Sequence, residues 1–286
     1  MQQSDVTLPA SSAPQAAPKP ARLPAFLRRN GSRPLLAGLI FFLLITGAAC
    51  VPGVFTPHDP LRNNITARLR PPFWDTENRG STTFILGTDG LGRDMLSRML
   101  HGIRISLLLA GAGLLVSMSL GVTFGLISGI FGGWFDIALM RIADLQLAFP
   151  YVVLAMAIVT ATQPSTPILV ILLGLAGWVY FARVVRGIVL QEMQKDYVKA
   201  AQVLGASRLR VGIRYVFPNA LPAVAVLATL QLPGLIIFEA TLSFLGLGVQ
   251  PPTPSLGGMM LDGTQYIANA WWVITLPGLA LMLTTM

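Results

Sequence analysis

Residues 196–222 read DYVKAAQVLGASRLRVGIRYVFPNALP and form a basic, amphipathic island of 27 residues in a strongly apolar chain. Long apolar segments on both sides hold this island at a membrane surface. The pattern predicts an Ala-rich helix, a hinge at Gly205, a basic second turn and a stop at Pro218 and Asn219. Such a compact segment indicates a docking site for a soluble partner. The chain is therefore predicted to be the membrane subunit of a complex that is driven from outside the bilayer.

The island admits two interpretations. Ala200, Ala201 and Ala206 give its first helix a low-profile apolar face, and Arg208 and Arg210 add positive charge to the next turn. In one interpretation this amphipathic segment enters a groove on a soluble partner. In the other it lies flat on anionic lipid. Residue spacing alone favours neither interpretation.

The composition is that of a membrane protein. The chain has 286 residues, of which 53% are hydrophobic and 11% are charged, with a net charge of +8. Soluble domains carry about 25% charged residues, so lipid is the solvent for much of this surface. The basic residues lie between apolar segments and not on a soluble face with aromatic residues, so we expect no binding to nucleic acid.

The apolar runs predict an all-α, polytopic membrane protein with six transmembrane helices, each about 20 residues long. Residues 1–34 are rich in Pro, Ala and Ser and are predicted to be a disordered cytoplasmic tail. Residues 35–54 follow as the first transmembrane helix. Residues 55–104 are predicted to be an extracytoplasmic segment that ends in an interfacial helix from Gly92.

Residues 105–286 are predicted to be a core of five further spans, with a cytoplasmic coupling loop at 190–218. We expect the helix that carries Asp136 to run on into the third span. We also expect Pro233 and Gly234 to interrupt the fifth span. The predicted bounds of the five spans are 105–131, 147–162, 168–189, 220–245 and 271–286.

The last span is short. Sixteen residues rise about 24 Å at 1.5 Å per residue, which is less than a hydrocarbon core of about 30 Å. We therefore expect the sixth span to be incomplete at Met286.

The basic residues set the orientation. The tail has five Lys and Arg against one acid, and residues 183–214 have seven against two. Both segments are therefore expected in the cytoplasm. In a chain with six spans, four crossings separate the tail from the loop after the fourth span, so both lie on the same side. Residues 55–104 carry seven Arg against five acids and weaken this assignment without reversing it. The expected location is the inner or plasma membrane.

No motif for covalent chemistry is present. The sequence has no GxxxxGK[ST] phosphate-binding loop. His58 and His101 are far apart, and Cys50 stands alone in an apolar run, so we expect no metal site and no disulfide. The chain is therefore predicted to be non-catalytic and to hold no cofactor.

Acids within the apolar segments are candidate functional residues. Arg141 and Asp144 lie three residues apart and are expected to form a structural pair on one helix face, with a proton relay as the alternative. Glu239 lies deep in the fifth span, where a carboxylate is a functional candidate by default. Its alternative role is to accept Ser or Thr hydrogen bonds between helices.

Four stretches resemble one family. Residues 196–219 are similar to the EAA loop of ABC-importer permeases, with Lys199 where that loop often has Glu. Three others resemble the peptide and nickel branch of that family, and together they cover most of the chain from residue 86. They are LGTDGLGRDMLSRMLHGIRISL at 86–107, GGWFDIALMRIADLQLAFP at 132–150 and EATLSFLGLGVQPPTPSLGGMM at 239–260.

This resemblance implies an ABC type I importer permease of the C-type in a dipeptide or oligopeptide system. It implies a second, similar permease subunit, two cytoplasmic ATPase subunits that bind ATP and Mg²⁺, and an extracytoplasmic binding protein. Lys199, Ala200, Ala201, Gly205, Ala206, Arg208, Arg210, Pro218 and Asn219 would then couple the chain to an ATPase. Nickel or glutathione stays open as the substrate. The other classes are an ion-coupled secondary transporter, with Glu239 or Asp144 as the coupling acid, and a membrane scaffold.

Overall fold

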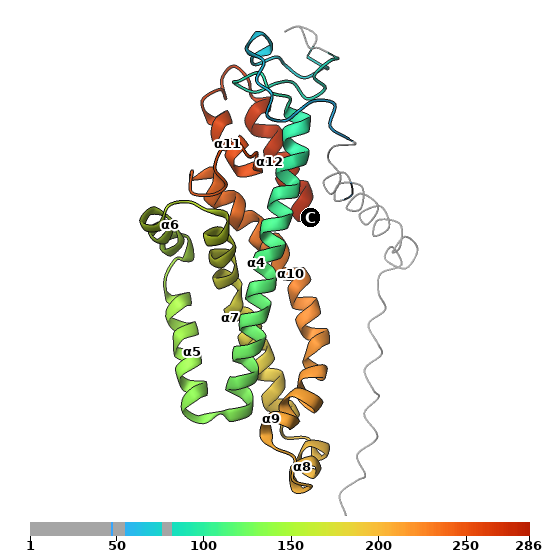
Figure 1. The fold of residues 1–286 in the computed structure, drawn as a ribbon, viewed down its shortest axis with the longest axis vertical. Helices are drawn as coiled ribbons and strands as arrows, with labels where there is room; N and C mark the ends of the chain where they lie inside the picture. The colour runs from blue at the N-terminus through green and yellow to red at the C-terminus, as the bar shows by residue number, and fades with distance from the viewer. Residues whose placement is uncertain (1–46, 48–54, 76–81) are drawn as a thin grey trace, which may run out of the picture. The chain divides into compact units, whose positions relative to one another are not determined.

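The computed structural model describes residue 47 and residues 55–75 and 82–286 (Figure 1). The regular structure in these ranges is helical, apart from one antiparallel bridge between Thr88 and Asp94. The all-α class is therefore confirmed. The predicted tail at 1–34 and, apart from Gly47, the predicted first span at 35–54 lie outside the described residues.

Helix α4 (Met95–Phe131) is the longest uninterrupted α-helix described. Asp94 caps it by accepting a hydrogen bond from the Ser97 amide at 3.0 Å. Its 37 residues rise about 55 Å, more than one bilayer core. The predicted interfacial helix from Gly92 is therefore wrong as a separate element, because no proline or turn interrupts the helix after residue 95.

Helix α7 (Thr166–Glu192) packs along α4 over most of its length (Figure 1). Small residues make this approach possible, as the pattern of glycines predicts. A Cβ atom at Gly121 would lie 2.4 Å from Phe181 Cβ, and one at Gly129 would lie 2.6 Å from Val189 Cβ. The predicted packing role of these glycines is confirmed.

The third span is not one helix. Helix α5 (Gly133–Ala148) and helix α6 (Tyr151–Thr162) meet at a bend of 89°. Pro150 has no amide hydrogen and holds Phe149 in an extended conformation, with φ −111° and ψ 146°. The expectation that the helix with Asp136 runs straight into the third span was therefore wrong.

The fifth span begins earlier than predicted and is continuous. Helix α9 (Arg208–Val211), the π-helical turn η2 (Gly212–Val216) and helix α10 (Phe217–Phe244) follow one another as a single apolar run. Pro218 therefore lies inside this run and does not stop it. Pro233 and Gly234 do not interrupt α10 either, since a helix in lipid can satisfy a freed carbonyl locally.

The remaining elements lie at the two ends of α4 (Figure 1). Helix α8 (Asp196–Val203) lies near its C-terminal end with α9, and helices α11 (Leu256–Thr264) and α12 (Trp272–Thr285) pack together near its N-terminal end. The short 3₁₀-helix η1 (Ile65–Ala67) belongs to the 55–94 segment. The Trp272 indole donates a hydrogen bond to the Thr88 carbonyl at 3.2 Å and so fastens this segment to α12.

The described helices suit a multi-pass membrane protein. Three of them are long and apolar enough to cross a bilayer, or four if the bent pair α5 and α6 is one span. Helix α12 is apolar but shorter. Large side chains such as Leu108, Leu115 and Ile142 are exposed on these helices, as lipid-facing positions require.

Candidate functional site

The 190–218 segment is anchored on its inner side. Val198 of α8 is fully buried in one cluster with Val189 of α7, Val211 of α9 and Ile130 near the end of α4. Gly212 lies against the same end, where a Cβ atom would meet Ile130 Cδ1 at 2.1 Å. Direct packing therefore connects α8 to the ends of α4 and α7 and to α9.

Gly205 ends α8 as the sequence predicts. Its φ of +87° favours glycine, because other residues are strained in this left-handed region. The Gly205 amide donates to Gln202 O at 2.9 Å, and the Ala206 amide donates to Ala201 O at 3.0 Å. These two bonds form a Schellman motif, which reverses the chain directly after α8.

The reversal exposes an apolar tip, Val203 and Leu204. Both residues are 87% exposed, although Leu204 directly precedes the hinge glycine. These two adjacent aliphatic side chains expose apolar surface to water at the end of a polar segment. This exposure costs about 25 cal/mol per Å² of apolar surface. A protein groove or a lipid surface would recover that free energy.

The basic residues next to the tip are open to solvent. Arg208 and Arg210 are exposed on α9 and form no ion pair within the part of the chain that the structure describes. Ser207 caps α9 by accepting from the Arg210 amide at 3.3 Å. Lys199 is 3.8 Å from Asp196, and both side chains are mostly exposed. The segment therefore presents an apolar tip flanked by positive charge.

Glu192 organises the base of the segment and was missed by the sequence analysis. It accepts hydrogen bonds from Lys195 Nζ at 2.6 Å and from the Tyr197 hydroxyl at 2.5 Å. These bonds raise the pKa of Lys195 and of Tyr197 above their ordinary values. The only sequence signal for this hydrogen-bond network was an acidic residue, Glu192, three residues before Lys195.

Asn219 belongs to the same hydrogen-bond network and does not cap the fifth span. Its side-chain amide donates to the Tyr215 carbonyl at 2.9 Å and to the Tyr197 hydroxyl at 3.1 Å. Glu192 lies 3.5 Å from the same amide nitrogen. The predicted stop at Pro218 and Asn219 is therefore replaced by a link between the start of α10 and the base of α8.

The predicted pair of Arg141 and Asp144 was wrong. Asp144 pairs with Arg183 of α7 at 2.7 Å, whereas Arg141 forms no ion pair with a described residue. Asp136 accepts from Arg186 of α7 at 2.6 Å. The helix-periodic pattern showed a possible pair within α5, but α7 brings two arginines to the same face. These ion pairs tie α5 to α7.

Glu239 is 1% exposed and lies between α4 and α10. It accepts a hydrogen bond from Ser106 Oγ at 2.6 Å and one from Ser243 Oγ at 2.7 Å. The alternative role given to Glu239, to accept serine hydrogen bonds between helices, therefore matches the geometry. Both of these partners are neutral hydroxyl groups.

Glu239→Gln is expected to cost little stability, because glutamine keeps an acceptor and can also donate to a serine hydroxyl. Glu239→Leu is expected to destabilise by about 2–4 kcal/mol, since it leaves two buried hydroxyls unpaired. Thermal unfolding of the two purified variants measures this difference. Equal melting temperatures for both would contradict the hydrogen-bonding role.

A pocket of about 420 Å³ lies at the bend between α5 and α6. Gln231 of α10 lines it together with Gln146, Tyr151 and Tyr180. Gln146 accepts from the Trp178 indole at 2.7 Å and donates to the Leu175 carbonyl at 2.5 Å, so its amide is held in place. Neither Gln146 nor the bend was predicted from the sequence.

No group of three or more His, Cys, Asp or Glu side chains suited to a metal ion occurs among the described residues. His58 contacts Phe84 and lies 3.8 Å from Asp94, whereas the His101 ring contacts the Ser97 carbonyl at 2.9 Å. Both histidines contact Ser97, because the His58 amide also donates to Ser97 Oγ at 3.3 Å.

Residues 121–286 match the family described as binding-protein-dependent transport system inner membrane component. A di/tripeptide transport system permease protein, DppC, of Pseudomonas aeruginosa is 39% identical over 88% of this chain and 82% of its own. The dipeptide transport system permease protein DppC of Escherichia coli K12 is 38% identical over 91% of this chain and 85% of its own.

The fold is also similar to a solved structure. A chain of the MetNI methionine ABC transporter in an inward-facing conformation superposes with a TM-score of 0.55 and 17% sequence identity. The match covers 67% of this chain and 91% of that chain. At this identity the likeness concerns the fold alone.

Proposed function

Because this chain belongs to the family of binding-protein-dependent transport system inner membrane components, we propose that it forms half of a peptide path across the inner membrane. The chain is a multi-pass permease subunit of an ABC importer, and such a subunit works in a complex with ATPases. The relatives named for di/tripeptide and dipeptide transport support short peptides as the substrate. The remaining path would come from a second, similar permease subunit.

The observation that carries the proposal is the anchored segment with an exposed apolar tip. Its inner side, through Val198, packs against the ends of α4 and α7, while Val203 and Leu204 lie outside that cluster and are exposed. A cytoplasmic ATPase that grips the tip would move these helix ends. ATP and Mg²⁺ would be bound by the ATPases, and this chain would hydrolyse nothing.

The pocket at the bend between α5 and α6 is the place where such a movement of the helices would act on the substrate. Gly121, Gly125 and Gly129 keep α4 and α7 in close contact. The bend between α5 and α6 opens a pocket against α10, and Gln231 lines it. Amides and tyrosine hydroxyls suit the peptide groups of a neutral substrate in passage. An extracytoplasmic binding protein would deliver that substrate to the opposite end of α4.

The test is uptake of labelled alanyl-alanine into liposomes that contain the chain, its co-purifying subunits and the binding protein. We expect uptake to need ATP on the side of the membrane where the ATPase subunits lie. Uptake should fall at least tenfold in Arg208→Glu, which places a negative charge beside the tip. Arg62→Glu, an equal charge change on an exposed residue of the 55–75 range, is the matched control and is expected to keep uptake.

An ion-coupled secondary transporter would behave differently. Uptake would then follow an imposed proton or sodium gradient without ATP, survive Arg208→Glu and fail in Glu239→Gln. That result would overturn the proposal. A membrane scaffold would give no uptake under either driving force, although it would still bind the cytoplasmic subunits.

A further inference from the structure

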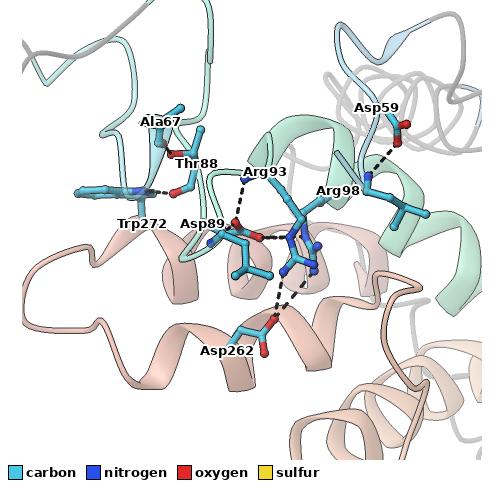
Figure 2. A network of polar contacts seen from close by, with 10 residues as sticks. Asp59, Ala67, Thr88, Asp89, Arg93, Arg98, Asp262 and Trp272 are labelled. Atoms are coloured by element: carbon cyan, nitrogen blue, oxygen red, sulfur yellow. Dashed lines mark hydrogen bonds and ion pairs between the residues drawn. The ribbon is translucent and has the colours of Figure 1, made fainter. Parts of the chain in front are cut away.

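A pocket of about 360 Å³ lies where the start of α4 meets α11. Figure 2 shows Arg93, Arg98 and Asp262, which are among the residues that line it. Arg93, Arg98 and Asp262 line it, together with Gln250 and Ser255. This end of α4 is opposite to the end that contacts α9, and the 37 residues between them exceed one bilayer core. The pocket therefore faces the side of the membrane opposite to the 190–218 segment.

Arg98 is an unusual residue for this position. It is 4% exposed, and its Nε and Nη1 atoms are buried without a hydrogen bond. A guanidinium group has five N–H donors and stays charged at any physiological pH. Burial of such a charge is costly unless an anion accepts from its donors.

The nearest carboxylate, Asp89, is engaged elsewhere. It accepts from the Leu91 amide at 2.9 Å, from the Arg93 amide at 2.9 Å and from Arg93 Nε at 2.7 Å. Arg98 Nε lies 3.4 Å from Asp89 Oδ2, without the geometry of a hydrogen bond. Asp89 thus fixes Arg93 and the 89–93 turn and leaves Arg98 with an ion pair but no hydrogen bond.

The other carboxylate, Asp262, is held loosely. Its Oδ2 atom is 3.7 Å from Arg93 Nη2 and 3.9 Å from Arg98 Nη2, beyond hydrogen-bond distance. Its side chain is 55% exposed. Partial burial raises the pKa of Asp262 above its ordinary value, although Arg98 and Arg93 act to lower it. Asp262 is therefore a partner that another carboxylate can displace.

Two other polar side chains of the pocket are already bonded. Gln250 donates to the Gly246 and Gly248 carbonyls, and Ser255 accepts from the Gly258 amide at the start of α11. The two guanidinium groups are the cationic donors of this pocket, and their Nη atoms form no hydrogen bond with a described residue. A guanidinium group can bind a carboxylate through two parallel N–H···O bonds.

We propose that the pocket lined by Arg93 and Arg98 is a carboxylate-binding site, and that its ligand is the terminal carboxylate of a short peptide. The carboxylate chemistry rests on the pocket itself, whereas the choice of a peptide rests on the proposed function. In the bound state the peptide carboxylate replaces Asp262 at the two arginines. The site would hold the peptide at the outer end of the path before α4 and α10 change their packing.

The test uses the complete membrane complex in nanodiscs, without the extracytoplasmic binding protein, and labelled alanyl-alanine as the probe. We expect saturable binding, with alanyl-alaninamide competing at least tenfold more weakly than unlabelled alanyl-alanine. Arg98→Gln should weaken binding at least tenfold. Asp262→Asn should strengthen it several-fold, because it removes the competing carboxylate from an exposed position. Arg62→Gln is the matched control and should bind as the wild type does.

Three results would overturn the inference. The first is equal competition by the peptide and its amide, and the second is unchanged binding in both Arg98→Gln and Asp262→Asn. The third comes from a separate ATPase assay with the binding protein added back: a loss in Arg98→Gln that is confined to stimulation by this protein would make the pocket a protein docking site. A gain of affinity in Asp262→Asn supports the inference even if Arg98→Gln fails to fold. ATP-driven uptake by the wild type without alanyl-alanine binding would leave the proposed function intact and remove only this site.

Discussion

Leu204→Glu is expected to lower ATP-driven uptake at least tenfold while the complex stays correctly inserted in the membrane. Leu204 is 87% exposed, so the substitution removes no internal contact of consequence. In a partner groove, however, a buried leucine contributes about 1.5–3 kcal/mol. A glutamate there would also lose its hydration, and the two effects together amount to far more than a tenfold loss of docking.

Gln202→Glu is the matched control for this substitution. It adds the same charge at an exposed position of α8, two residues from Leu204, without removing an apolar side chain. Co-purification of the ATPase subunits and uptake are measured together for both variants. If Leu204→Glu keeps its ATPase and full uptake, the apolar tip is not the coupling contact, and the interpretation of α8 as a lipid-surface helix gains support.

Gly121→Val is expected to prevent assembly of the helix core or to destabilise it by at least about 3 kcal/mol. A Cβ atom at this position would lie 2.4 Å from Phe181 Cβ, 2.5 Å from the Trp178 carbonyl oxygen and 3.0 Å from the Ala182 amide nitrogen. Two of these neighbours are backbone atoms, so a side-chain movement cannot relieve the overlap. Overpacking alone costs about 1–3 kcal/mol in adaptable cores, and this site is less adaptable.

Gly111→Val is the matched control, since a Cβ atom at Gly111 has no neighbour within 4 Å. Both glycines lie on α4 in the membrane, so their helix propensities change equally. The yield of monodisperse complex and its melting temperature are the measurements. Equal behaviour of the two variants would mean that α4 and α7 do not pack as closely as described.

Several features followed from local pattern alone. The all-α class follows from long apolar runs, because a backbone in lipid must satisfy its own hydrogen bonds. The hinge at Gly205 follows from a glycine directly after an Ala-rich amphipathic stretch, and its φ of +87° agrees. The close face at Gly121 follows from small residues spaced four apart. Each of these signals lies within one helix turn or one span.

Features that depend on contacts between distant segments were not predictable. Asp144 forms its ion pair with Arg183, 39 residues away, and not with Arg141, because α7 packs beside α5. The Asn219 amide donates to the Tyr197 hydroxyl, 22 residues away, because the start of α10 lies beside the base of α8. Proline rules also failed at Pro218, since the π-helical turn η2 absorbs the missing amide without ending the helix.

The amino-acid sequence by itself determined that this protein is a helical membrane protein with a basic, hinged segment between its apolar runs, because hydropathy and glycine positions act locally. Only the tertiary structure decided which charges meet. Arg98 and Asp262 are far apart in the chain, and α11 brings them to one pocket beside Asp89. The energy of a charge depends on its surroundings in space, so a buried, underbonded guanidinium group becomes visible only when the helices are packed.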